Sequence, residues 1–352
     1  MLDVNNHQPL ISIGLPVYNG EKHIQETLDS LTRQSFKNFE IVICDNASTD
    51  KTEEICRKYV EKDPRIKYHQ NSTNLGPAKN YNLVFERSQG KYFKWASYDD
   101  LYRPNYLEKC VDILEKDDSI VLCYPLVSFI DADSQEIGKS ATNLLNLKSM
   151  SPAKRFKNYQ RLIFPRAFAR PKNKIEFSQL DRSNDISPIQ KPAQKHPGGD
   201  RWTPIFGIIR SSALEKTPKI GSYVNADVVL LGELALLGRY HELPEHLFLY
   251  RDHTAASGRT NKGYYEWSVW FDPENKGKLI FPLWQQLFQF IAAIMRSRLS
   301  LPDKVACYNT MLKWLIGMRA RLLKEIAIVL SKSLKVDEFF VSKFNKQIPK
   351  QW

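Results

Sequence analysis

Two adjacent carboxylates, Asp99 and Asp100, directly follow an aromatic run that begins at Lys91. The run has the composition of a buried strand, and neighbouring carboxylates repel each other, so the fold must place them where a cation or solvent relieves the cost. Carboxylates in a crevice are the usual oxygen ligands of Mg²⁺ or Mn²⁺ bridging to substrate phosphates. Acidic residues also favour positions just before a helix, and that simpler interpretation stays open.

Polar residues also follow the first two apolar runs of the chain. The run at 10–15 is followed by a turn in which Gly20 allows backbone amides to approach a ligand. The run at 39–44 ends at Asp45, whose carboxylate can accept hydrogen bonds from a nucleoside base or ribose. Residues 46–50 suit helix capping, but Asp45 comes too early in the chain for that role.

These residues need strands and helices to position them. Apolar spacing predicts strands at 10–15, 39–44, 66–69, 91–96 and 119–130, and helices at 21–34, 52–61, 74–88 and 105–115. Strict alternation of strand and helix predicts parallel strands with right-handed crossovers, which is the doubly wound α/β class. Ligands bind at the carboxyl ends of such strands, so the turns carrying Gly20, Asp45 and Asp99 should face one crevice.

The alternation is lost after Lys139. Residues 139–200 predict an irregular excursion, Pro-rich and basic in its second part, followed by a strand at 202–210, a helix at 227–237 and a strand at 246–251. Residues 278–352 are helical, aromatic and basic. We therefore expect a catalytic domain over 1–277 and a helical extension over 278–352. Such an extension suits either an anionic membrane surface or packing against the domain or a second subunit.

Composition narrows the class of protein. The chain has 352 residues, a formal net charge of +12 and a pI near 9.3, which favours polyanionic surroundings. A nucleic-acid partner is not expected, because no zinc-finger or RRM signature is present. No GxGxxG follows the first strand, which disfavours a Rossmann dehydrogenase. The five cysteines lack metal-binding spacing, and no signal peptide or membrane-spanning run is apparent, so we expect a cytoplasmic protein that can associate with the inner face of the membrane.

Several motifs together carry a family resemblance. In order and spacing, ISIGLPVYNGE, IVICDNASTDKT, NLGPAKNYNL and FKWASYDD resemble the N-terminal half of inverting family 2 glycosyltransferases with the GT-A nucleotide-sugar-binding fold. The segment ADVVLLGELALLGRYHELPEHLFLYRDH resembles the part of the family that holds the catalytic base and closes the donor site. The resemblance covers the chain to about residue 260.

The resemblance implies roles for particular residues. The implied metal ligands are Asp99 and His253, with Mn²⁺ or Mg²⁺ as cofactor, and the implied general base is Asp227. The implied donor-binding residues are Pro16, Tyr18, Glu21, Asp45, Asn74, Lys79, Asp100 and Arg251. Helix capping remains an alternative for Asp227, and Glu233 is a competing carboxylate on another helical face.

The implied reaction is a single displacement with inversion, moving a hexosyl-type sugar from a nucleoside-diphosphate sugar to the hydroxyl of a saccharide or lipid-linked acceptor. Synthesis of a surface polysaccharide or glycoconjugate is the expected role. Ser97 stands where the family often has Asp, and Ala226 stands where a Glu commonly precedes the base. These departures leave open the alternative of a catalytically weak nucleotide-sugar-binding protein.

Overall fold

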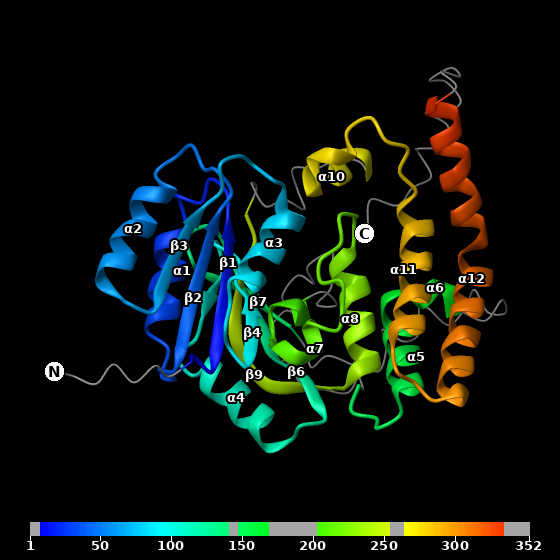
Figure 1. The fold of residues 1–352 in the computed structure, drawn as a ribbon, viewed down its shortest axis with the longest axis horizontal. Helices are drawn as coiled ribbons and strands as arrows, with labels where there is room; N and C mark the ends of the chain where they lie inside the picture. Colours follow the sequence, from blue (N-terminus) through cyan, green and yellow to red (C-terminus); the bar gives the residue numbers. More distant parts are fainter. Residues whose placement is uncertain (1–7, 141–146, 169–202, 254–263, 334–352) are drawn as a thin grey trace, which may run out of the picture.

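The computed structural model describes residues 8–140, 147–168, 203–253 and 264–333, and Figure 1 shows their arrangement. The described strands form one nine-stranded sheet in the order β3-β2-β1-β4-β8-β6-β9-β5, with β7 paired to β6. Helices cover both faces of this sheet, and further helices pack beyond one of them (Figure 1).

The first four strands are parallel. They are β1 (Ile11–Val17), β2 (Phe39–Asp45), β3 (Ile66–Gln70) and β4 (Tyr92–Trp95). Between them run α1 (Ile24–Thr32), α2 (Thr52–Lys62) and α3 (Pro77–Glu86). Strand β1 lies between β2 and β4, so the chain order reverses at β1, and the carboxyl end of β1 is where such sheets bind ligands. The expected α/β class is confirmed for this half.

The second half of the sheet is mixed rather than continuously parallel. Its strands are β5 (Leu101–Tyr102), β6 (Ile120–Ile130), β7 (Glu136–Lys139), β8 (Ile208–Arg210) and β9 (Arg239–Arg251). Strand β8 enters between β4 and β6 and runs antiparallel to both, while β6 and β9 are parallel. The prediction from alternating strands and helices therefore overestimated the number of parallel strand pairs. The reason is that β8, which joins the two halves of the sheet, comes from far along the chain.

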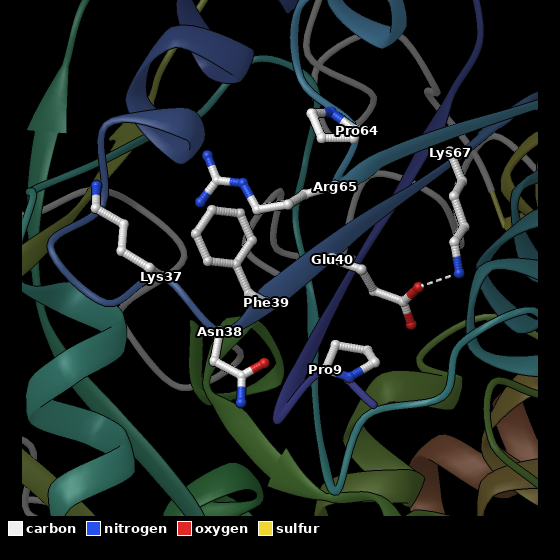
Figure 2. Close-up of a pocket in the computed structure, with 8 residues that line it drawn as sticks. All are labelled: Pro9, Lys37, Asn38, Phe39, Glu40, Pro64, Arg65 and Lys67. Carbon is white, nitrogen blue, oxygen red and sulfur yellow. Dashed lines mark hydrogen bonds and ion pairs between the residues drawn. The ribbon is translucent and has the colours of Figure 1, made fainter. Parts of the chain in front are cut away.

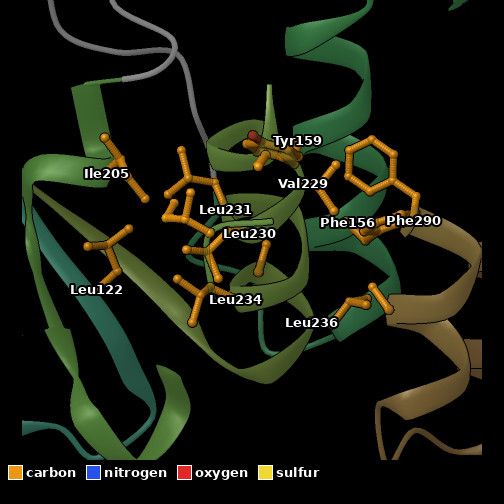
Figure 3. Close-up of a cluster of buried hydrophobic side chains, with 14 of the residues drawn as sticks. Leu122, Phe156, Tyr159, Ile205, Val229, Leu230, Leu231, Leu234, Leu236 and Phe290 are labelled. Carbon is orange, nitrogen blue, oxygen red and sulfur yellow. The ribbon is translucent and has the colours of Figure 1, made fainter. Parts of the chain in front are cut away.

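Two hydrophobic clusters separate the faces of the sheet. The helices α1, α2 and α4 (Tyr106–Lys116) cover one face, and α3 and α8 (Ala226–Leu237) cover the other. Helix α8 is apolar around its whole circumference because it is enclosed, with Leu122 of the sheet on one side and Phe156 and Phe290 of two outer helices on the other (Figure 3).

The remaining described helices surround this core. Within the stretch 139–200, for which the sequence predicted no regular structure, residues Pro152–Ile163 form α5 and Pro165–Phe168 form α6. The other elements are η2 (Thr203–Phe206), α7 (Ser211–Leu214), α10 (Tyr264–Phe271), η3 (Pro273–Asn275), α11 (Pro282–Arg296) and α12 (Leu301–Ser333). The rest of the expected excursion, 169–200, and of the expected extension, 334–352, lies outside the described residues.

Helices α11 and α12 share a hydrophobic cluster with the sheet. Phe290 and Trp314 are buried in the same cluster as Leu231 of α8, and α12 forms the outer edge of the molecule (Figure 1). Packing therefore accounts for one face of each helix. None of the described helices combines the length and apolar character needed to cross a bilayer.

Candidate functional site

The turns after β1 and β2 are bonded to each other and form a wall at the carboxyl end of the sheet. The backbone N–H of Asn19 donates to Ser48 Oγ at 2.9 Å, and its side-chain Oδ1 accepts from Thr49 N at 2.8 Å. Asn19 adopts a left-handed φ of 50°, which turns the chain sharply there. Gly20 is required beside it, because a Cβ would lie 2.7 Å from Val17 Cγ2 and 3.0 Å from the Tyr98 ring.

The predicted donor residues of the first turn lie on this wall. Pro16 occupies the buried end of β1, whereas the side chain of Tyr18 is 43% exposed. Glu21 accepts a hydrogen bond from Lys51 N at 3.0 Å, and its own backbone N–H donates to Asp50 at the same distance. Reciprocal bonds of this kind fix the two turns relative to each other.

Asp45 is fully buried at the end of β2. Its Oδ1 accepts from Ser48 N at 2.8 Å and its Oδ2 accepts from the Tyr68 hydroxyl at 2.6 Å. The carboxylate is thus already engaged by the protein and shapes the turn 46–50.

Asn74 and Lys79 lie on the same side as Asp45 but have different surroundings. Asn74 Oδ1 accepts from Asn46 Nδ2 at 2.8 Å, so Asn74 belongs to the wall. Lys79, on α3, forms an ion pair with Glu274 of η3. The structure thus ties Lys79 to the segment that follows α10 rather than leaving its ammonium group unpaired.

The acidic pair lies just after β4, beside β9. Asp99 Oδ2 lies 3.0 Å from His253 Nε2, and Asp99 Oδ1 is hydrogen-bonded to Ser97 Oγ. Asp100 is fully buried, with Oδ1 accepting from Arg251 N at 2.9 Å and Oδ2 without a partner among the described residues. Burial, and then the charge of Asp99, raises the pKa of Asp100 well above the usual range of an aspartate.

Arg251 is also at the site, but it is turned away from the crevice. Its side chain is 0% exposed, and Nε donates to the Asp99 carbonyl at 2.7 Å. Nη2 donates to Glu26 at 2.8 Å, while Nη1 donates to the carbonyls of Asp131 and Ala132 and to Ser134. In this arrangement every nitrogen of the guanidinium is bonded to the protein, and the side chain holds the acidic turn.

This packing predicts a large effect of Arg251→Lys on stability. An ammonium cannot satisfy the diverging acceptors that the guanidinium reaches, so we expect the free energy of unfolding to fall by about 2–4 kcal/mol in urea titrations. Arg57→Lys is the matched control, because Arg57 is 59% exposed in an i,i+4 pair with Glu53. That change should cost less than about 0.5 kcal/mol. Equal losses in the two variants would contradict the positioning role.

The predicted base, Asp227, lies in the first turn of α8 and is partly exposed. Burial raises the pKa of its carboxyl above the usual value for an aspartate. Burial, and then the charges of Asp99, Asp100 and Asp227, raises the pKa of the Tyr81 phenol on α3. The charges of carboxylates from two distant parts of the sequence therefore shift the pKa of the Tyr81 phenol in the same direction.

Glu233, the competing carboxylate, is elsewhere. It is buried and forms a bidentate ion pair with Arg296 of α11, with distances of 3.0 and 2.9 Å. Its role is to join α8 to α11, so it is not a second candidate base.

Sequence reasoning missed three residues of this region, namely His23, Glu26 and Tyr81. The His23 ring lies 5.2 Å from the His253 ring, its Nε2 has no partner among the described residues, and burial, followed by the charges of Arg251 and His253, lowers its pKa. Glu26 anchors Arg251 as described above. A lone histidine and a lone glutamate on a helix give no signal in a sequence, since their position depends on how α1 packs beside β9.

The donor set fits a cation shared with a substrate. Asp99 and His253 offer carboxylate and imidazole ligands side by side, and the orphaned Oδ2 of Asp100 lies on the adjacent residue. Within the described ranges, no group of three or more His, Cys, Asp or Glu side chains is arranged as a complete metal site. Mg²⁺ typically takes one or two protein carboxylates and completes its shell with water and phosphate oxygens, so the residues suit that mode of binding.

A surface hollow lies at the other end of the sheet. Figure 2 shows its lining near the beginning of β2 and β3, opposite to the carboxyl ends where the acidic pair lies. The lining residues are Pro9, Lys37, Asn38, Phe39, Glu40, Pro64, Arg65 and Lys67. Arg65 is stacked over Phe39 at 4.2 Å and Lys67 pairs with Glu40 at 2.7 Å, so the principal charges of the hollow are already paired.

Comparisons with known proteins agree with this geometry. Residues 12–176 match the family model described as glycosyl transferase family 2. An uncharacterized glycosyltransferase of Rickettsia typhi is 38% identical over 134 residues, which is 38% of this chain and 41% of that protein. One from Methanocaldococcus jannaschii is 36% identical over 126 residues, covering 35% of this chain and 43% of the relative. The chain thus spans about two fifths of the length of these relatives.

Solved structures support the fold. TarS 1–349 of S. aureus in complex with UDP has a TM-score of 0.54 and 16% identity, covering 88% of this chain and 72% of that one. The same protein in complex with UDP-GlcNAc has a TM-score of 0.52 and 15% identity over the same shares. The sheet order and these structural neighbours define a protein of the GT-A glycosyltransferase fold. The match to glycosyltransferase family 2 covers residues 12–176, a little under half of the chain.

Proposed function

We propose that the protein is an inverting glycosyltransferase that moves a hexosyl-type sugar from a nucleoside-diphosphate sugar to an acceptor hydroxyl. The observation that carries the proposal is the pairing of Asp99 with His253 after β4, at the end of the sheet where Asp45 closes β2. A saccharide or lipid-linked acceptor, in synthesis of a surface polysaccharide or glycoconjugate, is the role that we assign to it.

The chain's own residues divide the work in this proposal. Asp227 accepts the proton of the acceptor hydroxyl as the new bond forms, since a hydroxyl is a poor nucleophile. Asp99 and His253 hold the divalent cation, Mn²⁺ or Mg²⁺, and Arg251 fixes the turn that carries Asp99. A bound cation would neutralise negative charge on the departing diphosphate.

The wall between β1 and β2 is the proposed nucleoside site. The ring of Tyr18 is exposed and available for contact. Asn74 and the turn 46–50 provide backbone and side-chain polar groups. Asp45 stabilises that turn by accepting a hydrogen bond from Ser48 N. TarS binds UDP and UDP-GlcNAc, so uridine donors are the first to test.

A panel of nucleotide sugars tests the proposal. We expect release of nucleoside diphosphate from at least one donor in the presence of a suitable acceptor, with a requirement for Mn²⁺ or Mg²⁺. Isothermal titration of each donor should be run in parallel. Donor binding without turnover across a broad acceptor panel would favour the alternative, a catalytically weak nucleotide-sugar-binding protein, whose motivation is Ser97 and Ala226. Absence of any donor binding would contradict both.

A further inference from the structure

The outer face of α12 carries an apolar stripe with no partner in the described structure. Its residues recur every three to four positions and then every seven, which places them on one face of a helix. They are Leu301, Val305, Tyr308, Leu312, Ile316, Leu323 and Leu330, with exposed fractions from 39% to 75%. At 1.5 Å per residue the stripe is about 44 Å long.

This stripe is separate from the face that packs on the protein. The buried residues of α12 include Cys307, Met311, Trp314, Met318 and Leu322, which face the hydrophobic cluster shared with α8 and α11. The helix is therefore apolar on two faces, and protein packing uses only one of them. An exposed apolar surface of this length is unusual on a face that contacts only water, and such surfaces mark interaction sites.

The charges around the stripe are almost all positive. From Lys278 to Leu330 the acidic residues are Asp303 and Glu325 alone, and Glu325 is buried, where it accepts from Leu283 N at 3.0 Å. On α12 itself, Lys or Arg stand at 304, 313, 319, 321 and 324, whereas Arg296 of α11 is already paired with Glu233. An apolar stripe bordered by cations is complemented by a partner that has an apolar layer with anionic groups at its border.

Helix α5, which packs on α12, adds further exposed cations to this part of the molecule. Lys154, Lys157 and Arg161 are exposed on one face of α5, and this helix packs on α12 near its beginning, where Ser151 Oγ lies 3.4 Å from Asp303 Oδ1. Each Lys or Arg near an anionic bilayer contributes about 1 kcal/mol of attraction.

We propose that the outer face of α12 docks in the plane of a lipid bilayer that carries anionic headgroups. The helix lies in the interface, with the stripe toward the acyl chains and the cations at headgroup level, as amphipathic interfacial helices do. Arg319 falls within the stripe, and its long side chain can extend to the headgroups while its methylene groups stay apolar. This inference concerns a surface outside the crevice and does not depend on the proposed function.

Pairing of α12 with a second copy of the chain fits the observations less well. Exposed Glu or Asp residues normally complement Lys at the borders of a two-helix seam, and on α12 the described borders lack them beyond Asp303. Two copies would also bring Arg319 into the seam without an acidic partner from α12, which is costly. An anionic bilayer satisfies both features.

Vesicle co-sedimentation of the full chain tests the proposal. Vesicles of phosphatidylcholine alone should bind the protein at least about tenfold more weakly than vesicles that also contain phosphatidylglycerol, and added salt should weaken the binding because it screens the charges. The triple variant Leu312→Gln, Ile316→Gln, Leu323→Gln should lose at least about tenfold in partition to the anionic vesicles.

Two controls keep the outcome interpretable. Ile137→Gln removes a comparably exposed apolar side chain from β7, far from α12 in the sequence, and should bind as the unsubstituted protein does. Circular dichroism and urea unfolding of the triple variant should match the unsubstituted protein, since its three side chains are exposed. Undiminished vesicle binding by the triple variant would overturn the proposal. Failure of the unsubstituted protein to bind anionic vesicles would also overturn the proposal. If sedimentation velocity then showed a dimer that the triple variant loses, the stripe would be a contact between two copies of the chain instead.

Discussion

Asp227→Asn is expected to lower kcat by roughly 10²–10⁴-fold while leaving donor affinity within about twofold. Asn preserves the size and hydrogen-bonding geometry of the side chain at the start of α8 but cannot take a proton from the acceptor. The measurement is the rate of nucleoside diphosphate release with saturating acceptor, together with donor titration by calorimetry.

A matched control separates loss of the base from loss of a helix-terminal charge. Asp303 lies in the first turn of α12, as Asp227 lies in the first turn of α8, so Asp303→Asn removes a similar charge from a similar position. That variant should keep its kcat within about twofold. If Asp227→Asn retained full turnover, another group would have to be the base.

The pH profile gives a second check on Asp227. The charged carboxylate is the active form, and burial raises its pKa, so kcat/KM should fall as the pH decreases through a value above the usual pKa of an aspartate. The direction is fixed, because protonation removes the base and deprotonation restores it. A profile that stays flat down to the usual aspartate range would contradict the assignment.

Asp99→Asn is expected to reduce kcat/KM by roughly 10²–10³-fold at limiting Mn²⁺, because it removes the carboxylate that lies beside His253 in the proposed cation site. Excess Mn²⁺ should recover part of the loss if His253 and the diphosphate still hold the ion. The measurement is a Mn²⁺ titration of initial rate for the unsubstituted protein, Asp99→Asn and His253→Gln. Both variants should require more Mn²⁺ for half-maximal rate.

Asp133→Asn serves as the control for net charge. Asp133 is an exposed aspartate in the neighbouring turn after β6, and the change alters the formal charge by the same amount. Its Mn²⁺ dependence should match that of the unsubstituted protein. An unchanged Mn²⁺ dependence in Asp99→Asn would remove Asp99 from the cation site.

The first half of the fold was predictable because each of its elements is local. The run 39–44 became β2 (Phe39–Asp45), and the helix expected at 105–115 became α4 (Tyr106–Lys116), since apolar spacing and turn residues act over a few positions. The expected strand at 202–210 was only partly right, because Thr203–Phe206 forms a short 3-10 helix and Ile208–Arg210 alone pairs as β8. Its antiparallel place between β4 and β6 depends on long-range packing that no local pattern encodes.

In the candidate site, too, the local features could be predicted from the sequence and the long-range contacts could not. Motif spacing predicted one site for Asp99, Asp100 and Asp227, but it did not show how each polar group is used. Arg251 carries a charge suited to a diphosphate, yet its burial among the Asp99 carbonyl, Glu26 and the turn after β6 makes it a positioning residue. Neither those contacts nor the approach of His23 to His253 follows from residue type, because both arise where α1 meets β9.

The most direct test of the central claim is a crystal structure with Mn²⁺ and the nucleoside diphosphate of the best donor, using anomalous scattering to locate the metal. The account predicts one Mn²⁺ bound by Asp99 and His253 and bridging to the diphosphate, with the nucleoside along the wall that carries Tyr18 and Asn74. The account would be contradicted if Mn²⁺ and the diphosphate were located away from Asp99, for example in the hollow near the beginning of β2 and β3.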